Sequence, residues 1–164
     1  ARREPVMRYG AVDKVLRTLM LGCILLAMGA YPPAYGAAQT LKEAKPFAQH
    51  FLALQLSDAS PAKQTQVLEI ANNVLKFYGP DNVAIDVVTF GPGVRLLFAN
   101  NTNAEMVSSL ATQGVRFEVC ETTLNTIKRE TGSVPTLNAH AVKVKAGVPR
   151  IMSLVSEGYV LVRP

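Results

Sequence analysis

Residues 50–90 read HFLALQLSDASPAKQTQVLEIANNVLKFYGPDNVAIDVVTF, and this stretch predicts a strand, a helix and a second strand in succession. The apolar run at 50–56 is followed by a polar segment, a pattern that is typical of a buried strand. Ser60 suits the N-cap of the helix that follows, and Pro61 suits its first position. The stretch therefore predicts a strand–helix–strand unit of the kind found in parallel sheets.

The helix between these two strands has one apolar face. Gly79-Pro80 ends the helix, and residues 83–90 are rich in the β-branched side chains that favour strands. The apolar positions recur at helical spacing, which predicts that this face packs on the sheet. They are Leu68, Ala71, Leu75 and Tyr78, with Val67 and Val74 beside them.

Residues 91–164 continue the alternation. Gly91-Pro92-Gly93 predicts a turn with unusual backbone geometry. The elements expected after it are a short amphipathic segment at 94–99, helices at 103–113, 122–131 and 148–157, and strands at 115–120, 141–144 and 159–162. We therefore expect one α/β domain, with a mainly parallel sheet of about five strands and helices on both faces.

Residues 1–37 predict an N-terminal signal peptide. Basic residues precede an uninterrupted apolar run at 19–30, and small residues suited to cleavage follow it. The run is shorter than the roughly 20 residues that a membrane-spanning helix needs, and a retained membrane anchor is the alternative. We expect a linker at 38–49, a folded domain at 50–164 and a periplasmic or otherwise exported protein, with membrane contact only if the segment is retained.

The distribution of charge argues against nucleic acid as a partner. The chain has a formal net charge of +5, but residues 37–164 hold 12 Lys and Arg against 10 Asp and Glu. No stretch of this region combines a cluster of basic residues with aromatic ones. The excess positive charge belongs mainly to the predicted signal peptide.

Cleavage of the signal would remove Cys23 and leave Cys120 as a single cysteine. In an oxidising compartment such a cysteine is buried and inert, paired between chains, or kept for chemistry. Cys120 ends a predicted strand and immediately precedes a predicted helix, whose N-terminal amides and dipole stabilise a thiolate. It is therefore a candidate nucleophile or persulfide carrier, and a small buried hydrophobic residue is the alternative.

Ligands of open parallel sheets bind beyond the carboxyl ends of the strands. Asp58, the turn Gly91-Pro92-Gly93 and Cys120 each follow or end a predicted strand, so we expect them to gather at that edge. For Asp58 the pattern favours an Asx-turn or cap residue over a general base. Thr122, in the first turn after Cys120, is a further candidate for substrate binding.

The two histidines, His50 and His140, give little support to a metal site, because no cysteine or carboxylate stands at ligand spacing from them. A Cys120–His140 pair with the histidine as base requires the last loop to lie over the strand at 115–120. Gly91-Pro92-Gly93 lacks the spacing of a dinucleotide fingerprint. We expect neither a metal nor a cofactor.

Three segments of residues 50–164 resemble the DsrE/DsrF-like family. Residues 115–124 (VRFEVCETTL) are similar to that family's cysteine segment, and the strand ending in Gly91-Pro92-Gly93 with Leu96-Leu97 is similar to its second motif. Residues 147–164 (GVPRIMSLVSEGYVLVRP) are similar to its carboxyl-terminal motif.

This resemblance implies a flavodoxin-like α/β fold, trimeric or hexameric assembly, and a cysteine used in sulfur relay. Carried over to this chain, it implies Cys120 as the sulfur acceptor and Gly91, Pro92 and Gly93 as pocket backbone. The hypothesis is an envelope sulfur-handling protein that is a sulfurtransferase-like carrier at most, with a donor or acceptor protein as partner. The alternative is a non-catalytic oligomeric binding or structural module in which Cys120 belongs to the core.

Overall fold

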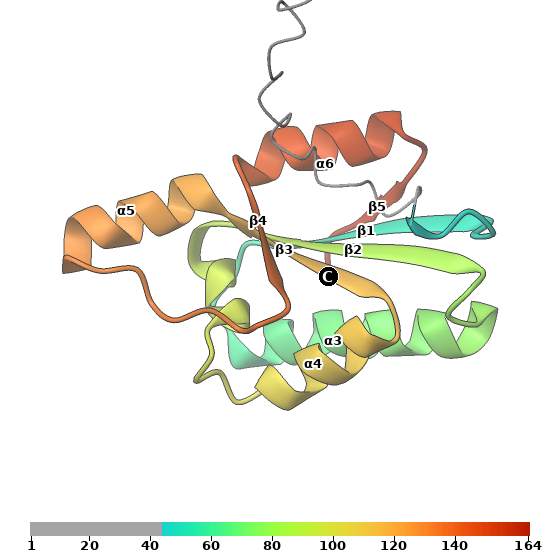
Figure 1. Ribbon diagram of the computed structural model, residues 1–164, viewed down its shortest axis with the longest axis horizontal. Coiled ribbons are helices and arrows are strands. Elements are labelled where there is room, and N and C mark those ends of the chain that lie inside the picture. Colours follow the sequence, from blue (N-terminus) through green and yellow to red (C-terminus); the bar gives the residue numbers. More distant parts are fainter. Residues whose placement is uncertain (1–43) are drawn as a thin grey trace, which may run out of the picture. The chain divides into compact units, whose positions relative to one another are not determined.

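The computed structural model describes residues 44–164 (Figure 1). The predicted signal peptide and the first half of the predicted linker lie outside the described residues, so both stay predictions. Among residues 44–164, no helix is long and apolar enough to cross a bilayer. The elements are β1 (His50–Leu56), α3 (Pro61–Tyr78), β2 (Val83–Thr89), the 3-10 helix η1 (Gly91–Leu97), α4 (Ala104–Thr112), β3 (Val115–Cys120), α5 (Glu121–Thr131), β4 (Ala141–Val144), α6 (Gly147–Ser156) and β5 (Val160–Val162).

The five strands form one parallel sheet in the order β4-β3-β2-β1-β5. The predicted α/β class and the parallel sheet are confirmed. The strand order differs from the 2-1-3-4-5 order of flavodoxin. Strands β2, β3 and β4 are each added next to the strand that precedes them in the chain. The crossover through α6 then returns the chain to the far side of β1, where β5 pairs.

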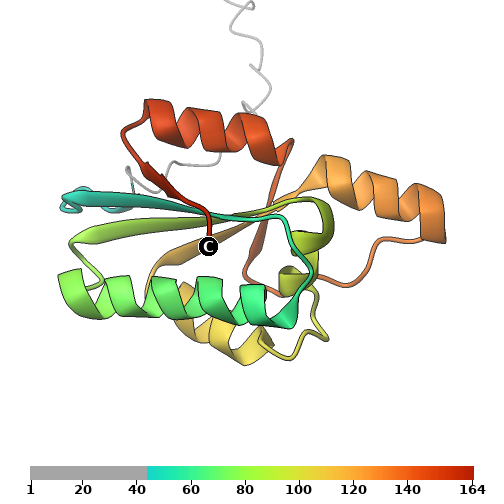
Figure 2. The same ribbon diagram turned by 180° about the vertical axis from the view of Figure 1, so that it is seen from behind.

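Helices cover both faces of the sheet, as Figures 1 and 2 show from opposite sides. On one face α3 and α4 cover a large apolar core. On the other face Ile151 and Leu154 of α6 pack against Ala53, Ala84 and Val88. Because side chains alternate along a strand, β1 and β2 contribute to both cores, whereas the apolar residues of β3 belong to the first core alone. All seven residues of the central strand β2 are buried, including a carboxylate, Asp86.

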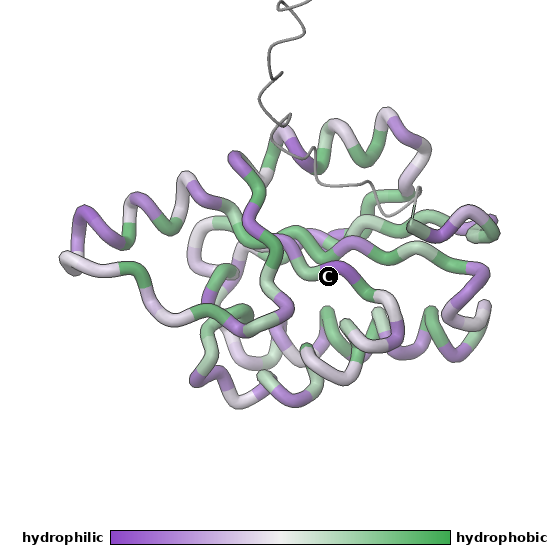
Figure 3. Tube along the Cα trace, in the orientation of Figure 1, coloured by the Kyte–Doolittle hydropathy of each residue, from purple (hydrophilic) through white to green (hydrophobic). Residues whose placement is uncertain are grey.

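Helix α5 differs from the other helices, because it projects beyond the carboxyl ends of the strands (Figure 1). Leu124 is its one buried residue, and the helix is largely hydrophilic along its length (Figure 3). Its first turn nevertheless packs against η1, which follows β2. The carboxyl edge of the sheet is thus bounded by η1, the start of α5 and the start of α6.

Residues 45–49, at the end of the predicted linker, contact the folded domain. Lys45 Nζ donates hydrogen bonds to the carbonyl oxygens of Pro80 (2.7 Å) and Val83 (3.1 Å). The backbone amide of Gln49 donates to Asn82 O at 2.9 Å. Contacts of the domain therefore extend several residues ahead of β1.

Candidate functional site

Cys120 is the last residue of β3 and the N-cap residue of α5. Strand alternation places its side chain on the α6 face of the sheet, the same face as Glu118. The residue is buried, with 4% of its surface exposed, and it is the free cysteine of residues 44–164. The sequence predicted this position at a strand end before a helix, and the structure places it there.

Hydrogen-bond donors from two helix N-termini converge on Cys120 Sγ. The backbone amide of Gly147, the first residue of α6, donates to Sγ at 3.3 Å. The hydroxyl and amide of Thr123 and the amide of Thr122, all in the first turn of α5, also face the sulfur. Such amides have no partner within their own helix, so they are free to stabilise a negative charge.

These donors decide the acidity of the thiol. Burial by itself raises the pKa of Cys120, because it disfavours the charged form. The hydrogen bonds from Thr123, Gly147 and Thr122 act in the opposite direction and outweigh burial, so the pKa is lowered. A thiol of lowered pKa is more ionised near neutral pH, which is the form that reacts as a nucleophile.

The turn Gly91-Pro92-Gly93 supports the cysteine through Thr123. Gly91 has a φ of 52°, in the left-handed region, and its amide donates to Thr123 Oγ1 at 3.0 Å. The Thr123 hydroxyl can therefore turn its own hydrogen toward the sulfur. Gly91 and Pro92 also line a cavity of about 260 Å³ between η1 and α5.

Gly93 fulfils a different role in the same turn. A Cβ atom there would lie 2.7 Å from the carbonyl carbon of Leu56, at the end of β1. Only glycine lets η1 approach β1 this closely. The three residues predicted as pocket backbone thus form a turn after β2 that packs closely on the end of β1. The same turn is linked to Cys120 by the hydrogen bond from Gly91 to Thr123.

Thr122 and Asp58 lie in different surroundings. Thr122 Oγ1 donates to Lys145 O at 2.9 Å, which ties the first turn of α5 to the loop between β4 and α6. Asp58 Oδ1 accepts a hydrogen bond from the Ser60 amide at 2.6 Å, as the Asx-turn interpretation predicts. Asp58 lines a separate cavity of about 440 Å³ beyond the ends of β1 and β5. Strand β2 stands between β1 and β3, so the fold does not bring Asp58 to the cysteine.

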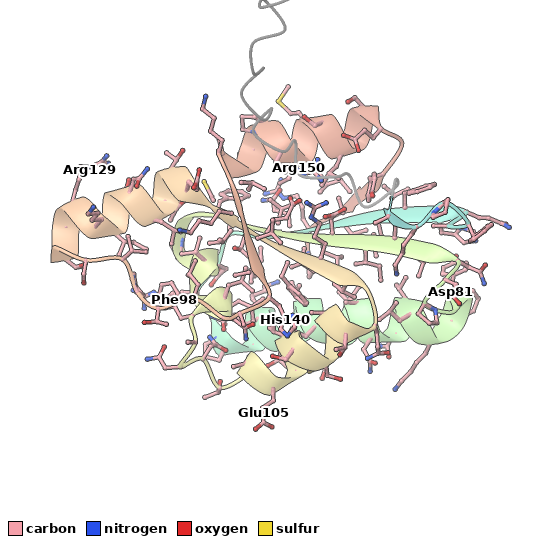
Figure 4. All side chains as sticks on the ribbon, viewed as in Figure 1. Asp81, Phe98, Glu105, Arg129, His140 and Arg150 are labelled. Atoms are coloured by element: carbon pink, nitrogen blue, oxygen red, sulfur yellow. The ribbon has the colours of Figure 1, made fainter. Side chains whose placement is uncertain are left out.

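His140 does not lie near Cys120. It precedes β4, whose first residue pairs with Phe117, whereas the cysteine pairs with Val144 at the other end of the strand. Figure 4 shows His140 at the end of β4 that is remote from α6. The parallel register therefore separates the two side chains by the length of the strand, and a Cys120–His140 pair is wrong for this fold. His50 also lies at the amino edge of the sheet, where its ring stacks on Tyr78.

A buried cluster of charged side chains lies next to Cys120 on the α6 face, and the sequence reasoning missed it. Asp86 and Glu118, on neighbouring strands, are both fully buried. Arg150 of α6 lies between the helix and the sheet (Figure 4), and its Nε donates to both Glu118 oxygens at 3.0 and 2.9 Å. The signal for this cluster was Asp86 inside the apolar run of β2, together with Glu118 on the face of β3 that does not carry Val115, Phe117 and Val119.

Asp86 is the least satisfied member of the cluster. The Tyr159 hydroxyl is the hydrogen-bonding group that acts on its carboxylate, and Arg150 Nη2 is 3.9 Å from Oδ1. Burial first, and the neighbouring Glu118 second, raise the pKa of Asp86 to about 7, against the opposing effect of the two arginines, Arg150 and Arg116. A carboxyl group of this kind holds its proton close to neutrality.

Comparisons with known proteins support the fold and leave the chemistry open. No protein-family model matches the sequence, and no curated protein matches it either. A solved structure from Methanobacterium thermoautotrophicum, described as the protein of unknown function MTH1491, matches with a TM-score of 0.63 and 26% sequence identity. The match covers 70% of this chain and 99% of that one. The likeness to the DsrE/DsrF-like family therefore stays a prediction.

Proposed function

We propose that this protein handles sulfane sulfur, and that Cys120 accepts it as a persulfide and passes it to a partner. The observation that supports this most is the convergence of hydrogen-bond donors on Cys120 Sγ. An inert core cysteine needs no such donors, whereas a thiolate or a persulfide anion is stabilised by them. The resemblance of the segment around Cys120 to the DsrE/DsrF-like family favours the same chemistry.

In the proposed reaction the Cys120 thiolate attacks the outer sulfur of a sulfane donor such as thiosulfate. A new S–S bond forms at the cysteine, the S–S bond of the donor breaks, and sulfite leaves with the electron pair. An acceptor thiolate then attacks the terminal sulfur, and the Cys120 thiolate is the leaving group. A lowered thiol pKa favours both the attack and the departure. The transfer needs no external oxidant or reductant.

The predicted signal peptide sets where this transfer would take place. We propose that the protein works in the periplasm or another exported location, where a protein or small-molecule sulfur donor and a thiol acceptor must also be present. N-terminal sequencing of the protein recovered from its cells tests this proposal. A mature chain that still begins ahead of residue 19 would contradict cleavage.

Mass spectrometry after incubation with thiosulfate or polysulfide tests the sulfur chemistry. We expect an adduct of about 32 Da, the mass of one sulfur atom, on the peptide that contains Cys120. The Cys120→Ser variant should lack the adduct, and the Cys23→Ser variant should retain it. Absence of the adduct from the wild-type protein, or its persistence in Cys120→Ser, would refute the proposal.

A second candidate function is a non-catalytic oligomeric module in which Cys120 is part of the core. It is supported by the burial of Cys120 and by large apolar side chains that α6 exposes, namely Val148, Met152 and Val155. In this reading the exposed side chains contact further copies of the chain, and the thiol reacts with an alkylating reagent only after denaturation. A monomeric mass in light scattering would exclude the oligomer, and alkylation of the native thiol would exclude an inert cysteine.

A further inference from the structure

The first turn of α6 contacts β3 at two neighbouring points. Gly147 donates its amide hydrogen to Cys120 Sγ, and Arg150 donates from Nε to the Glu118 carboxylate. Cys120 and Glu118 are two residues apart in the strand, so they lie on the same face. Gly147 and Arg150 belong to one helical turn, which the bond from the Arg150 amide to Ala146 O closes at 3.2 Å. A shift at either contact is therefore transmitted to the other.

The ion pair is the stronger of the two contacts. Glu118 is fully buried and the Arg150 side chain is 17% exposed, so water replaces neither partner easily. Charge-assisted hydrogen bonds of this kind are stronger than neutral ones, and separating a buried pair leaves uncompensated charge. The other charged groups around the pair are Asp86 from β2, Arg116 from β3 and Glu157 from the C-cap of α6.

The other side of the α6 turn is in close contact with the end of β2. A Cβ atom at Gly147 would lie 2.8 Å from Phe90 Cβ, so the turn has no space to move further toward the sheet on that side. Phe90 limits how closely the turn can approach, whereas the ion pair prevents it from moving away. The Gly147 amide thus lies between Phe90 and the ion pair, opposite the sulfur.

We propose that the Glu118–Arg150 ion pair is a latch that holds the first turn of α6 on β3 and thereby positions the Gly147 amide against Cys120. Glu118 and Arg150 are then positioning residues, which act on the sulfur only through Gly147. The latch also keeps the cysteine covered, so its release would expose the sulfur to a donor or an acceptor. The proposal gives a role to the buried charges beside the proposed sulfur carrier, and it rests on the proposed function for its biological purpose.

Glu118→Gln separates this role from a simple effect of charge. The substitution conserves shape but weakens the hold on Arg150. A looser Gly147 amide stabilises the thiolate less, so we expect the thiol titration to move to higher pH by roughly half to one pH unit. Loss of a nearby negative charge would by itself move the titration to lower pH. The direction of the shift therefore distinguishes the two explanations.

The experiment uses the full chain with Cys23→Ser, so that Cys120 is the single thiol. The rate of alkylation by iodoacetamide, measured across pH, gives both the titration midpoint and the rate of the fully ionised thiol. In Glu118→Gln we expect a higher midpoint and a several-fold higher limiting rate. An unchanged or lower midpoint, or an unchanged limiting rate, would overturn the latch.

Three further variants complete the design. Glu121→Gln removes a negative charge beside Cys120 without touching α6, and should lower the midpoint. Gly147→Ala forces the turn away from Phe90 without any change of charge. It should raise both the titration midpoint and the limiting rate of alkylation. Arg150→Lys keeps the positive charge but loses the paired geometry, so it should also raise both quantities even if Glu118→Gln does not fold.

No sulfur donor enters these measurements. A negative persulfide experiment therefore leaves the latch testable, and a failed latch leaves the persulfide result standing. If Gly147→Ala raises the midpoint but both Glu118→Gln and Arg150→Lys leave it unchanged, the amide matters and the ion pair does not hold it. That combination would refute the proposal.

Discussion

Replacement of Asp86 by asparagine should stabilise the protein at alkaline pH and have little effect at acidic pH. Asp86 is fully buried on β2, where the Tyr159 hydroxyl and Arg150 face its carboxylate. Burial and the adjacent Glu118 raise its pKa from 3.8 to about 7. Asparagine has the same shape and cannot ionise, so it resembles the protonated aspartic acid.

The sign of the pH dependence follows from proton binding in the two states. Between about pH 4 and pH 7 the folded protein holds a proton on Asp86 that the unfolded chain has released. The contribution of this group to stability is therefore complete below about pH 4 and is lost as pH rises through 7. The raised pKa corresponds to about 4 kcal/mol. The attraction of Arg150 for the charged form is already part of that pKa, so we expect Asp86→Asn to gain about 4 kcal/mol at alkaline pH relative to acidic pH.

Urea unfolding of the full chain, followed by circular dichroism, measures this difference. The wild type and Asp86→Asn should have similar free energies of unfolding below about pH 4, and the variant should gain stability between about pH 4 and pH 7 and keep that advantage toward about pH 8.5. Asp81→Asn, at an exposed aspartate, serves as the matched control and should show no such trend. A destabilisation by Asp86→Asn that is equal at both pH values, or an advantage that grows on acidification, would refute the reasoning.

Two further substitutions test the turn and the thiol environment. Gly93→Ala forces a Cβ atom against the Leu56 carbonyl and should cost more than about 2 kcal/mol in urea unfolding, whereas Gly132→Ala, which has open space but a φ of 84°, should cost about 1 kcal/mol. Equal costs would contradict the close approach. Thr123→Val removes a hydroxyl that stabilises the thiolate and should move the thiol titration to higher pH, as followed by thiolate absorbance. The same shift in Thr126→Val, one turn along the helix, would argue against a specific hydrogen bond.

The periodic patterns in the sequence predicted the elements closely. The strands β1 and β3 begin and end at the predicted residues, and Ser60 and Pro61 mark the start of α3 as expected. These features are local, because an apolar period or a cap depends on residues a few positions apart. Cys120 was predictable for the same reason, since its place between a strand and a helix is visible along the chain.

The surroundings of the cysteine depended on contacts that no local pattern contains. Gly147 lies 27 residues from Cys120 in sequence, and it reaches the sulfur only because α6 crosses the sheet after β4. The sequence left open a Cys120–His140 pair if the last loop lay over the strand at 115–120, but the parallel register of β4 places His140 at the opposite edge. Parallel pairing between distant segments decides such distances, and sequence spacing does not.

The sequence by itself therefore determined the α/β class, the limits of most elements and the position of Cys120 at the carboxyl edge of the sheet. Only the tertiary structure decided that the cysteine is covered, that donors from two helices converge on it, and that Asp86, Glu118 and Arg150 are buried beside it. The physical reason is that alternation assigns a side chain to a face of the sheet, whereas strand order and helix crossovers decide what lies opposite that face.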